Sequence, residues 1–329
     1  MNNQMPLNTS AKHVLVLGGN GFIGSHLADA LLKLGHKVKV FDRPYTVSLG
    51  TSNANRKNVT LIEGDLTCDA DLVNALEGCD FCFHLVSTVL PKSSNLDPLF
   101  DIETNLMGTV KLLNHAVKAK VKKIIFLSSG GTVYGQPAYL PIDENHPTDP
   151  LCSYGITKLA IEKYLNLYFH LYGLDYTVLR LSNPFGERQR TQAAQGAIAV
   201  FLGKALQNQP IEIWGDGSVT RDYIHISDVI TALLHSILCT GEEKILNIGS
   251  GVGLSLNQVL DGIELIIGKQ VNRVYSQGRL FDVPSSVLSI ERAIKVLGWK
   301  PVMTFEEGLS RMVKWINENE KISGWGFVS

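Results

Sequence analysis

Two side chains near the middle of the chain, Tyr154 and Lys158, have the types and the spacing for proton transfer. They open a segment with helical periodicity, and positions i and i+4 of a helix lie on one face. An ammonium beside a phenol, with a second positive group nearby, favours the phenolate and lowers the pKa of the phenol. A tyrosine made acidic in this way can take a proton from a hydroxyl near neutral pH. The spacing alone is common, and two surface residues of an ordinary helix are the alternative.

Hydroxyl side chains follow a buried strand shortly before this helix. The run Ile-Ile-Phe-Leu-Ser-Ser-Gly-Gly-Thr-Val-Tyr-Gly places Ser128, Ser129 and Thr132 at the end of the strand. Their hydroxyls could hydrogen-bond a reacting oxygen and the phenol of Tyr154. An ordinary turn after a strand is the alternative, because serine and glycine are frequent in turns.

A glycine-rich turn near the start of the chain predicts a phosphate site. The run Val-Leu-Val-Leu-Gly-Gly-Asn-Gly-Phe-Ile-Gly is an apolar strand that leads into Gly18, Gly21 and Gly24. Gly18 suits the tight turn, Gly21 lets backbone amides approach a pyrophosphate, and Gly24 lets the next helix pack closely on the strand. The positive end of that helix would face the anion. Asp42 ends the second strand, where an acidic residue reads the ribose hydroxyls of a dinucleotide.

Alternating strands and helices must bring these residues together. The alternation predicts an α/β fold, a doubly wound parallel Rossmann sheet with helices on both faces. The carboxyl ends of its strands meet at one edge. The expected strands are 13–17, 37–41, 59–62, 80–86, 122–127 and 176–182, and the expected helices are 22–34, 69–77, 99–119 and 153–172. One crevice should then collect Gly18, Asp42, Asp65, Ser87, Ser128 and Asn183.

The pattern changes after Asn183. A helix is expected at 197–206, followed by short segments that are punctuated by glycine. We therefore predict a nucleotide-binding domain at 12–183 and a smaller α+β substrate-binding lobe at 184–329. Part of 220–250 is expected to return to the first domain.

Composition excludes several classes of function. The chain has 329 residues, of which 45% are hydrophobic and 19% charged, with a net charge of −1. This size allows a large core, and no basic field for nucleic acid is evident. The first dozen residues lack the apolar centre of a secretory signal, and no run is long enough to cross a bilayer. A cytoplasmic protein without nucleic-acid or membrane partners is expected.

The five cysteines predict no metal site. Cys79 and Cys82 have C-x-x-C spacing, but no second pair completes a zinc site. They lie in a segment that is typical of a buried strand. Core cysteines with free thiols, which suit a reducing compartment, are therefore expected.

At this point the chain resembles the extended short-chain dehydrogenases/reductases of the nucleotide-sugar epimerase/dehydratase group. The resemblance covers about residues 12–318. Besides the motifs above, it is carried by Gly64-Asp65-Leu66, Asn105-x-x-Gly108-Thr109, Arg180-x-x-Asn183-x-Phe-Gly186, Arg221-Asp-Tyr-Ile-His225 and Leu297-Gly298-Trp299-x-Pro301. The resemblance implies a bound NAD and a nucleotide-sugar substrate.

The resemblance also implies positions for individual residues. Asp65 and Leu66 would flank the adenine, whereas the segment 84–87 and Asn105 would lie near the nicotinamide. The full expected cofactor set is Gly18, Gly21, Phe22, Ile23, Gly24, Asp42, Arg43, Asp65, Leu66, Leu85, Ser87, Asn105, Ser128, Tyr154 and Lys158. Asn183 and Arg221 would hold the diphosphate, and a guanidinium suits that role. The expected substrate set is Asn183, Ala197, Arg221, Arg279, Asp282 and Ser286.

The residue at the end of the second strand favours NAD over NADP. The carboxylate of Asp42 would repel a 2′-phosphate, although the neighbouring Arg43 could accommodate one. A solvated side chain near the adenine is the alternative for Arg43. NAD is the prediction.

The reaction follows from what the strand end lacks. In this family Tyr154 would take the proton of a sugar 4-hydroxyl while NAD accepts the hydride. Related dehydratases carry an acid pair after the strand-end hydroxyl, where this chain has Gly131 and Thr132. Related decarboxylases place a glutamate at the position of Thr132. With both missing, 4-epimerisation of a UDP-hexose is the predicted reaction.

One position departs from the family pattern. The usual catalytic serine or threonine lies four residues before the tyrosine of the Val-Tyr-Gly turn, and here that residue is Gly130. Ser129 and Thr132 are the available substitutes. We rank Thr132 slightly ahead of Ser129, because its side chain follows the glycine pair.

Ser286 is the candidate determinant of the sugar. It aligns with a position where the epimerases place a residue beside the sugar's 2-substituent, and a serine leaves room for an N-acetyl group. UDP-GlcNAc and UDP-GalNAc are then expected substrates as well as, or instead of, UDP-Glc and UDP-Gal. An ordinary loop serine is the equally weighted alternative.

Two other functions and an assembly state complete the predictions. A nucleotide-sugar reductase, dehydrogenase or dehydratase of the same family is one alternative, and a catalytically inactive NAD-binding regulator is another. Intact Tyr154 and Lys158 argue against the regulator. In similar proteins the helices at 99–119 and 153–172 form a four-helix interface, so a homodimer is expected.

Overall fold

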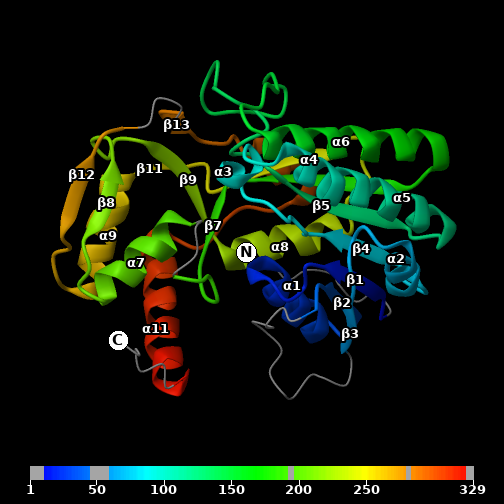
Figure 1. The fold of residues 1–329 in the computed structure, drawn as a ribbon, viewed down its shortest axis with the longest axis horizontal. Helices are drawn as coiled ribbons and strands as arrows, with labels where there is room; N and C mark the ends of the chain where they lie inside the picture. Colours follow the sequence, from blue (N-terminus) through cyan, green and yellow to red (C-terminus); the bar gives the residue numbers. More distant parts are fainter. Residues whose placement is uncertain (1–10, 45–58, 192–195, 279–282, 324–329) are drawn as a thin grey trace.

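The computed structural model describes residues 11–44, 59–191, 196–278 and 283–323. A parallel sheet of seven strands, in the order β10-β6-β5-β4-β1-β2-β3, forms the larger part of the molecule (Figure 1). Its strands are β1 (His13–Leu17), β2 (Lys37–Asp42), β3 (Val59–Glu63), β4 (Phe81–His84), β5 (Lys123–Ser129), β6 (Asp175–Leu181) and β10 (Ile245–Ile248). The predicted doubly wound α/β fold is confirmed.

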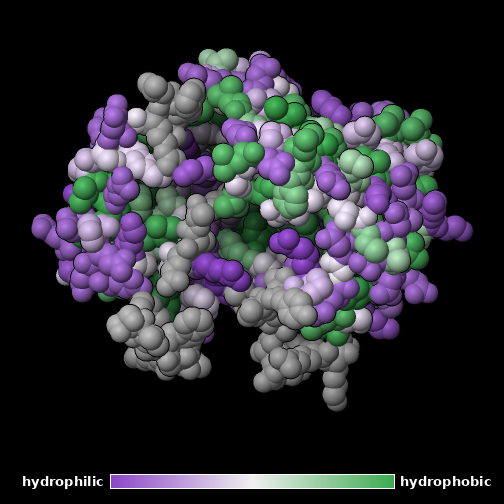
Figure 2. Space-filling model, viewed as in Figure 1, coloured by the Kyte–Doolittle hydropathy of each residue, from purple (hydrophilic) through white to green (hydrophobic). Residues whose placement is uncertain are grey.

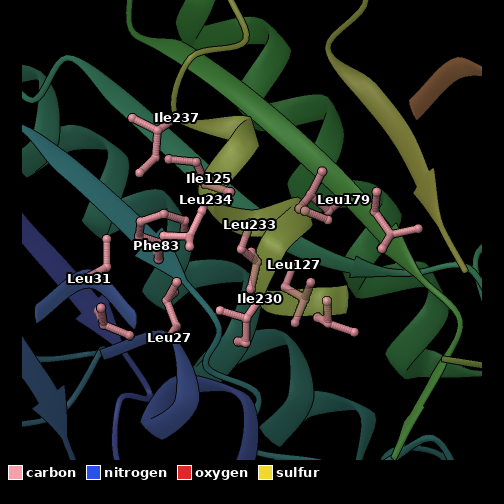
Figure 3. Packing of buried hydrophobic residues seen from close by; sticks show 14 of the residues in the cluster. Leu27, Leu31, Phe83, Ile125, Leu127, Leu179, Ile230, Leu233, Leu234 and Ile237 are labelled. Carbon is pink, nitrogen blue, oxygen red and sulfur yellow. The ribbon is translucent and has the colours of Figure 1, made fainter. Parts of the chain in front are cut away.

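The central strands are apolar on both faces because both faces are covered. Val14 and Val16 of β1 point into one core cluster, whereas Leu15 and Leu17 point into the other. Helices α1 (Phe22–Lys33) and α8 (Ile226–Ser236) cover the first face, and Figure 3 shows their leucines and isoleucines packed on β4, β5 and β6. Helices α2 (Asp69–Leu76), α5 (Gly108–Lys118) and α6 (Ser153–Tyr172) cover the second face.

Two predicted elements differ from those observed. The strand expected at 80–86 ends at His84, after which the chain turns to form a cleft wall. The helix expected at 99–119 is interrupted. It consists of α4 (Pro98–Asp101), the π-helix η2 (Ile102–Met107) and α5, and a short helix α3 (Pro91–Ser94) precedes it. π-helical turns of this kind occur frequently at functional sites.

The smaller part of the molecule is built from short strands. β7 (Asn183–Phe185), β9 (Thr220–His225), β11 (Gly253–Ser255) and β13 (Ser285–Ser286) form one sheet, and β8 (Ile211–Trp214) pairs in parallel with β12 (Arg273–Ser276). A separate core joins them to α7 (Ala197–Leu206), α9 (Leu256–Ile267) and α11 (Phe305–Ser323). The helix predicted at 197–206 is confirmed.

Residues after 220 also contribute to the larger part. Strand β10 pairs with β6 at the edge of the seven-stranded sheet, and α8 packs against α1. Helix α10 (Glu291–Leu297) lies beside β10 and α8. The chain therefore crosses between the two parts more than once. The space-filling view shows a hollow between them, with apolar residues visible inside it (Figure 2).

The described residues contain neither a candidate membrane span nor a candidate metal centre. No helix among them combines the length and the apolar character that a membrane span requires. No group of histidine, cysteine, aspartate or glutamate in the same ranges is arranged to hold a metal ion. The cysteines that the sequence places in a buried strand, Cys79 and Cys82, are buried free thiols.

Candidate active site

The glycine-rich turn brings helix α1 close to strand β1. Gly18 has a φ of +81°, a conformation that few other residues adopt at low cost. A Cβ on Gly24 would lie 2.1 Å from the carbonyl oxygen of Gly18, so only glycine allows this contact. Helix α1 begins after Gly21, and no side chain caps its N-terminus. Its first N–H groups are therefore suited to an anion.

Acidic residues at the ends of the next two strands are fixed by local hydrogen bonds. The carboxylate of Asp42 accepts bonds from the backbone N–H groups of Asn20, at 3.0 Å, and Arg43, at 2.9 Å. The carboxylate of Asp65 accepts from the N–H and the hydroxyl of Thr67, and these bonds lower the pKa of Asp65. The strand ends are thus ordered as the sequence predicts for an adenosine site.

One cleft collects most of the residues that were expected at the cofactor. It runs from the glycine turn across the ends of β2, β3 and β4. The lining residues are Gly18, Gly21, Phe41, Asp42, Arg43, Gly64, Asp65, Leu66, Leu85, Val86, Ser87, Thr88, Phe100 and Thr104. An elongated cleft with a bare helix N-terminus and an acidic residue at the second strand fits NAD. Phe22 and Ile23 form the first turn of α1 and are partly buried against the core.

Asn105 supports the wall of this cleft from behind. Its side-chain oxygen accepts from the N–H of Thr88 at 3.0 Å, and its amide donates to the hydroxyl of Thr88 at 2.8 Å. Asn105 is 5% exposed. The segment after β4 is therefore held in place by a side chain from η2.

Tyr154 and Lys158 lie in the first turns of α6, at the predicted spacing. The ammonium of Lys158 donates to the carbonyl of Leu127 at 3.0 Å and lies 5.6 Å from the centroid of the Tyr154 ring. Burial lowers the pKa of Lys158 to about 8, although the carboxylates of Asp101 and Glu162 oppose the shift. The neighbouring His84 has a pKa of about 3 because it is buried and faces the Lys158 charge. It is therefore neutral.

The pKa of Tyr154 is raised in the protein without a bound cofactor, whereas the predicted acidic phenol includes a second positive group beside Lys158. Burial raises it in the protein alone, and the nearby Cys152 and Asp101 raise it further. Ser129 is the hydrogen-bonding neighbour that partly offsets this rise. The phenol retains its proton in this state, so Lys158 by itself does not acidify it. A further positive charge in the cleft is needed.

The hydroxyls at the end of β5 are directed to different places. Ser128 donates to the buried carboxylate of Glu162 at 2.6 Å. The hydroxyl of Thr132 is buried and has no hydrogen-bond partner within the part of the chain that the structure describes. Ser129 faces Tyr154. A Cβ on Gly130 would lie 2.6 Å from the Cδ1 atom of Leu288, which explains why a side chain is absent there.

The smaller sheet carries three of the six expected substrate residues, Asn183, Arg221 and Ser286. Strand β9 carries Arg221, which pairs in register with Ser286 of β13, and strand β7 beside it begins with Asn183. The guanidinium of Arg221 donates to the carbonyls of Thr220 and Val283, and the amide of Asn183 donates to the carbonyl of Asp222. Ser286 is 8% exposed. Ala197 is the first residue of α7. Arg279 and Asp282 lie outside the described residues.

Sequence reasoning missed the polar residues behind the site. Glu162 and Arg180 form a buried ion pair at 2.6 Å, and Asp101 is fully buried beside α6. The spacing Lys158-x-x-x-Glu162 places both charges on one helix face, so the sequence could have identified Glu162. Asp101 carries no comparable signal, because only the tertiary fold brings it to α6.

A parallel sheet with a cleft at its glycine-rich turn, together with a Tyr-x-x-x-Lys helix, is typical of an enzyme with the short-chain dehydrogenase/reductase fold, although Tyr154 and Lys158 are not among the lining residues of the cleft given above. A family model described as the NAD-dependent epimerase/dehydratase family matches residues 14–249. The chain therefore belongs to that family, and NAD is its cofactor.

Three similar proteins are named as 4-epimerases. The UDP-glucose 4-epimerase of Mycolicibacterium smegmatis is 35% identical over 93% of this chain and 99% of its own. The crystal structure of UDP-glucose 4-epimerase with UDP-glucose from Thermotoga maritima has a TM-score of 0.87 and 34% identity, over 94% of this chain and 99% of that one. A UDP-N-acetylglucosamine 4-epimerase from Methanobrevibacter ruminantium, in complex with UDP-N-acetylmuramic acid, has a TM-score of 0.89 and 32% identity, over 94% and 100%.

Other relatives carry different names. A dTDP-4-dehydro-6-deoxyglucose reductase of Escherichia coli is 31% identical over 92% of this chain and 96% of its own. A UDP-N-acetyl-alpha-D-glucosaminuronate decarboxylase of Bacillus cytotoxicus is 30% identical over 94% and 99%. The family therefore includes several reactions, and the side chains at the site must distinguish them.

Proposed function

We propose that the protein is an NAD-dependent 4-epimerase of a UDP-hexose. The observation that carries the proposal is the side-chain content of the site. The phenol of Tyr154 faces the hydroxyl of Ser129, and the adjacent strand end presents Gly131 and Thr132, where other reactions require an acid. Hydride transfer can occur in such a site, but the groups for eliminating water or carbon dioxide are missing from it.

Tyr154 acts as the base that removes the proton of the sugar 4-hydroxyl. NAD, when bound, would supply a hydride acceptor and donor and a positive charge near the phenol, which would favour its ionised form. Lys158 remains close to the phenol and adds a second positive charge. Ser129 hydrogen-bonds the phenol and the reacting oxygen. We propose Ser129 in this role ahead of Thr132, because Ser129 faces Tyr154 in the structure.

The remaining residues anchor the substrate while the sugar turns over. Asn183 and Arg221 lie on adjacent strands and hold the diphosphate in our proposal, with Ala197 beside them at the start of α7. A guanidinium fork is well suited to phosphate oxygens. Arg279 and Asp282, which lie outside the described residues, are proposed near the nucleotide's ribose.

Ser286 makes the site tolerant of an N-acetyl group at the sugar 2-position. It lies in register with Arg221, so it belongs to the same sheet as the proposed diphosphate anchor. A relative that is named for UDP-N-acetylglucosamine supports this choice of substrate. UDP-GlcNAc/UDP-GalNAc is accordingly a proposed substrate pair, together with UDP-Glc/UDP-Gal.

A homodimer is also proposed, through α6 and the helical segment 99–119, which comprises α4, η2 and α5. One face of α6 exposes Tyr164, Leu167 and Leu171 at helical spacing, and Leu99 and Met107 are exposed on the neighbouring segment. Leu171, at the end of this face, is 60% exposed. An apolar surface of this kind is typical of a protein–protein interface.

One assay tests the proposed function against the alternatives. The purified protein is incubated with each UDP-sugar and no added cofactor, while products and absorbance at 340 nm are followed. Interconversion of the two sugars without a net change in absorbance supports the epimerase. A rate that is at least about a thousandfold lower in Tyr154→Phe would support Tyr154 as the catalytic base. Turnover that consumes added NAD(H) stoichiometrically would instead identify a reductase or dehydrogenase. Binding without any turnover would identify a regulator.

A further inference from the structure

The N-terminus of α6, which carries Tyr154 and Lys158, is held by a segment far away in sequence. The residue before the helix, Cys152, makes no capping hydrogen bond with its side chain. Instead, the N–H of Ser153 donates to the side-chain oxygen of Asn95 at 2.9 Å, and the N–H of Tyr154 donates to the hydroxyl of Ser94 at 3.0 Å. Two of the N–H groups that a helix leaves unpaired are thus satisfied by residues near α3.

Asp101, at the end of the same segment, makes the central contact. Its Oδ2 atom accepts from the hydroxyl of Ser153 at 2.7 Å and from the hydroxyl of Thr157 at 3.2 Å. Ser153 immediately precedes Tyr154, and Thr157 immediately precedes Lys158. One carboxylate therefore holds the backbone neighbours of both candidate catalytic side chains.

The same carboxylate links α6 to the wall of the cofactor cleft. Its Oδ1 atom accepts from the amide of Asn105 at 2.9 Å, and Asn105 in turn holds Thr88 at the cleft. Asp101 is 0% exposed, so its charge is not screened by water. The position near a helix N-terminus favours a negative charge.

We propose that Asp101 is a positioning residue, which fixes the first two turns of α6 against the cofactor cleft and sets a buried negative charge against the helical turn that carries Lys158. The inference deepens the proposed function, and its kinetic arm rests on that function. Asp101 touches neither the cleft nor the reacting atoms, so its action passes through Ser153, Thr157 and Lys158.

The charges around this carboxylate support the second half of the proposal. Asp101 raises the pKa of three groups on or beside α6, namely Cys152, Tyr154 and Lys158. Burial lowers the pKa of Lys158, and Asp101 raises it more than any other group does, followed by Glu162 on α6. The charge of Glu162 is already paired with Arg180, whereas the hydrogen bonds to Asp101 given above come from neutral donors. His84 on β4 faces Lys158 but is neutral.

The first experiment removes the charge and retains the shape. In Asp101→Asn the hydroxyls of Ser153 and Thr157 can reverse and accept from the new amide, so the contacts survive. We expect the pKa of Lys158 to fall by about one unit, because an opposite charge at short range has been removed. It is measured by NMR titration of protein labelled with ¹³C at the lysine Cε atoms, with Lys158→Met used to assign the signal.

A matched control lies four residues earlier. Asp97 caps α4 by accepting from the N–H of Phe100 and is exposed. Asp97→Asn removes the same charge from the same segment and retains a good helix cap. It should leave the titration of Lys158 within 0.2 unit of the wild type (roughly the precision of such a titration). An unchanged Lys158 pKa in Asp101→Asn, or an equal fall in both variants, would overturn the proposal.

The kinetic arm separates the charge from the hydrogen bonds. Removing the charge lowers the pKa values of Tyr154 and Lys158 together, so both limbs of the pH–rate profile of Asp101→Asn should shift to lower pH. The double variant Ser153→Ala/Thr157→Val keeps the charge and removes the two hydroxyls. We expect its kcat to fall about fivefold or more, with KM within about twofold and the pH limbs unmoved.

The two arms make the outcomes distinguishable. If the wild type interconverts no UDP-sugar, the proposed function fails, and the NMR titration still decides the role of Asp101. If Asp101→Asn does not fold, the double variant decides it. A kcat within twofold of the wild type in that variant would then refute the positioning role.

Discussion

Gly130 occupies the position where the family usually has its catalytic hydroxyl, and restoring that hydroxyl should damage the protein. In Gly130→Ser the new Cβ atom would lie 2.6 Å and 3.2 Å from the two terminal carbons of Leu288 and 3.1 Å from the carbonyl oxygen of Arg180. Carbon atoms pack best at about 3.5–4.0 Å. The Leu288 side chain would have to move by roughly 1 Å, a distance that follows from this optimum.

Leu288 has little freedom to move. It is 1% exposed and packs in a small cluster with Val133, Tyr134 and Ile142. Its N–H donates to the buried carboxylate of Asp222. Overpacking of this kind typically costs about 1–3 kcal/mol of unfolding free energy. We expect a loss in that range for Gly130→Ser, measured by urea unfolding.

The neighbouring glycine provides the control. A Cβ on Gly131 would meet no atom within 4 Å, so Gly131→Ser should change the unfolding free energy by less than about 0.5 kcal/mol. Leu288→Val should relieve the clash, so the double variant with Gly130→Ser should be more stable than the sum of the singles by about 1 kcal/mol. Equal stability of the two serine variants, or strict additivity with Leu288→Val, would refute the reasoning.

Four further results are expected. Ser129→Ala should lower kcat about tenfold to a hundredfold. Thr132→Val should keep kcat within about threefold and leave the unfolding free energy unchanged or higher, because the hydroxyl that it removes is buried without a partner among the described residues. Equal losses of kcat in the two variants would contradict this assignment. Ser286→Tyr should reduce turnover of UDP-GlcNAc at least about tenfold relative to UDP-Glc, measured by steady-state kinetics; an unchanged ratio would show that the position does not read the sugar. Glu187 has a pKa of about 2, because hydrogen bonds and charges, led by His225, outweigh the effect of burial. The pKa of Glu187 is depressed in the folded state, so the stabilisation that its charged form provides is present above pH 4.5 and is lost as pH falls toward 2. Glu187→Gln should therefore flatten the dependence of the unfolding free energy on pH in that window. An unaltered slope would refute this prediction. Leu167→Glu should convert the dimer into a monomer, because it places a charge on the exposed apolar face of α6. Light scattering at micromolar concentration measures this change, and a wild type that is already monomeric would refute the proposed dimer.

Periodicity and glycine spacing were enough to predict most of the fold. The observed bounds lie within a residue or two of the predicted ones for strand β1 and helices α1, α6 and α7. The pattern of apolar residues in a buried strand or a long amphipathic helix is enough to predict where the element begins and ends. The break in the helix at 99–119 was not predictable in this way. Its residues keep a helical pattern, and the π-helix arises where Asn105 must reach both Thr88 and Asp101.

The candidate site was predictable in types but not in roles. Tyr154, Lys158 and the three hydroxyls were identified from spacing, yet sequence could not say which hydroxyl faces the phenol. The tertiary fold decides it, and Leu288, which is distant along the chain, leaves little room for a side chain at position 130. The desolvation that raises the pKa of the Tyr154 phenol was not predictable from the sequence either, because it exists only in the folded state.

The sequence by itself determined the chemistry that is available: a glycine turn for a pyrophosphate, an acidic strand end, and a phenol four residues before an ammonium. These are local features, and a few neighbouring residues suffice to specify them. The tertiary structure alone decided how that chemistry is tuned. Asp101, Glu162 and Leu288 reach the site from separate segments, and their effects depend on burial and on distances across the fold, since the strength of a charge or a contact is set by its surroundings.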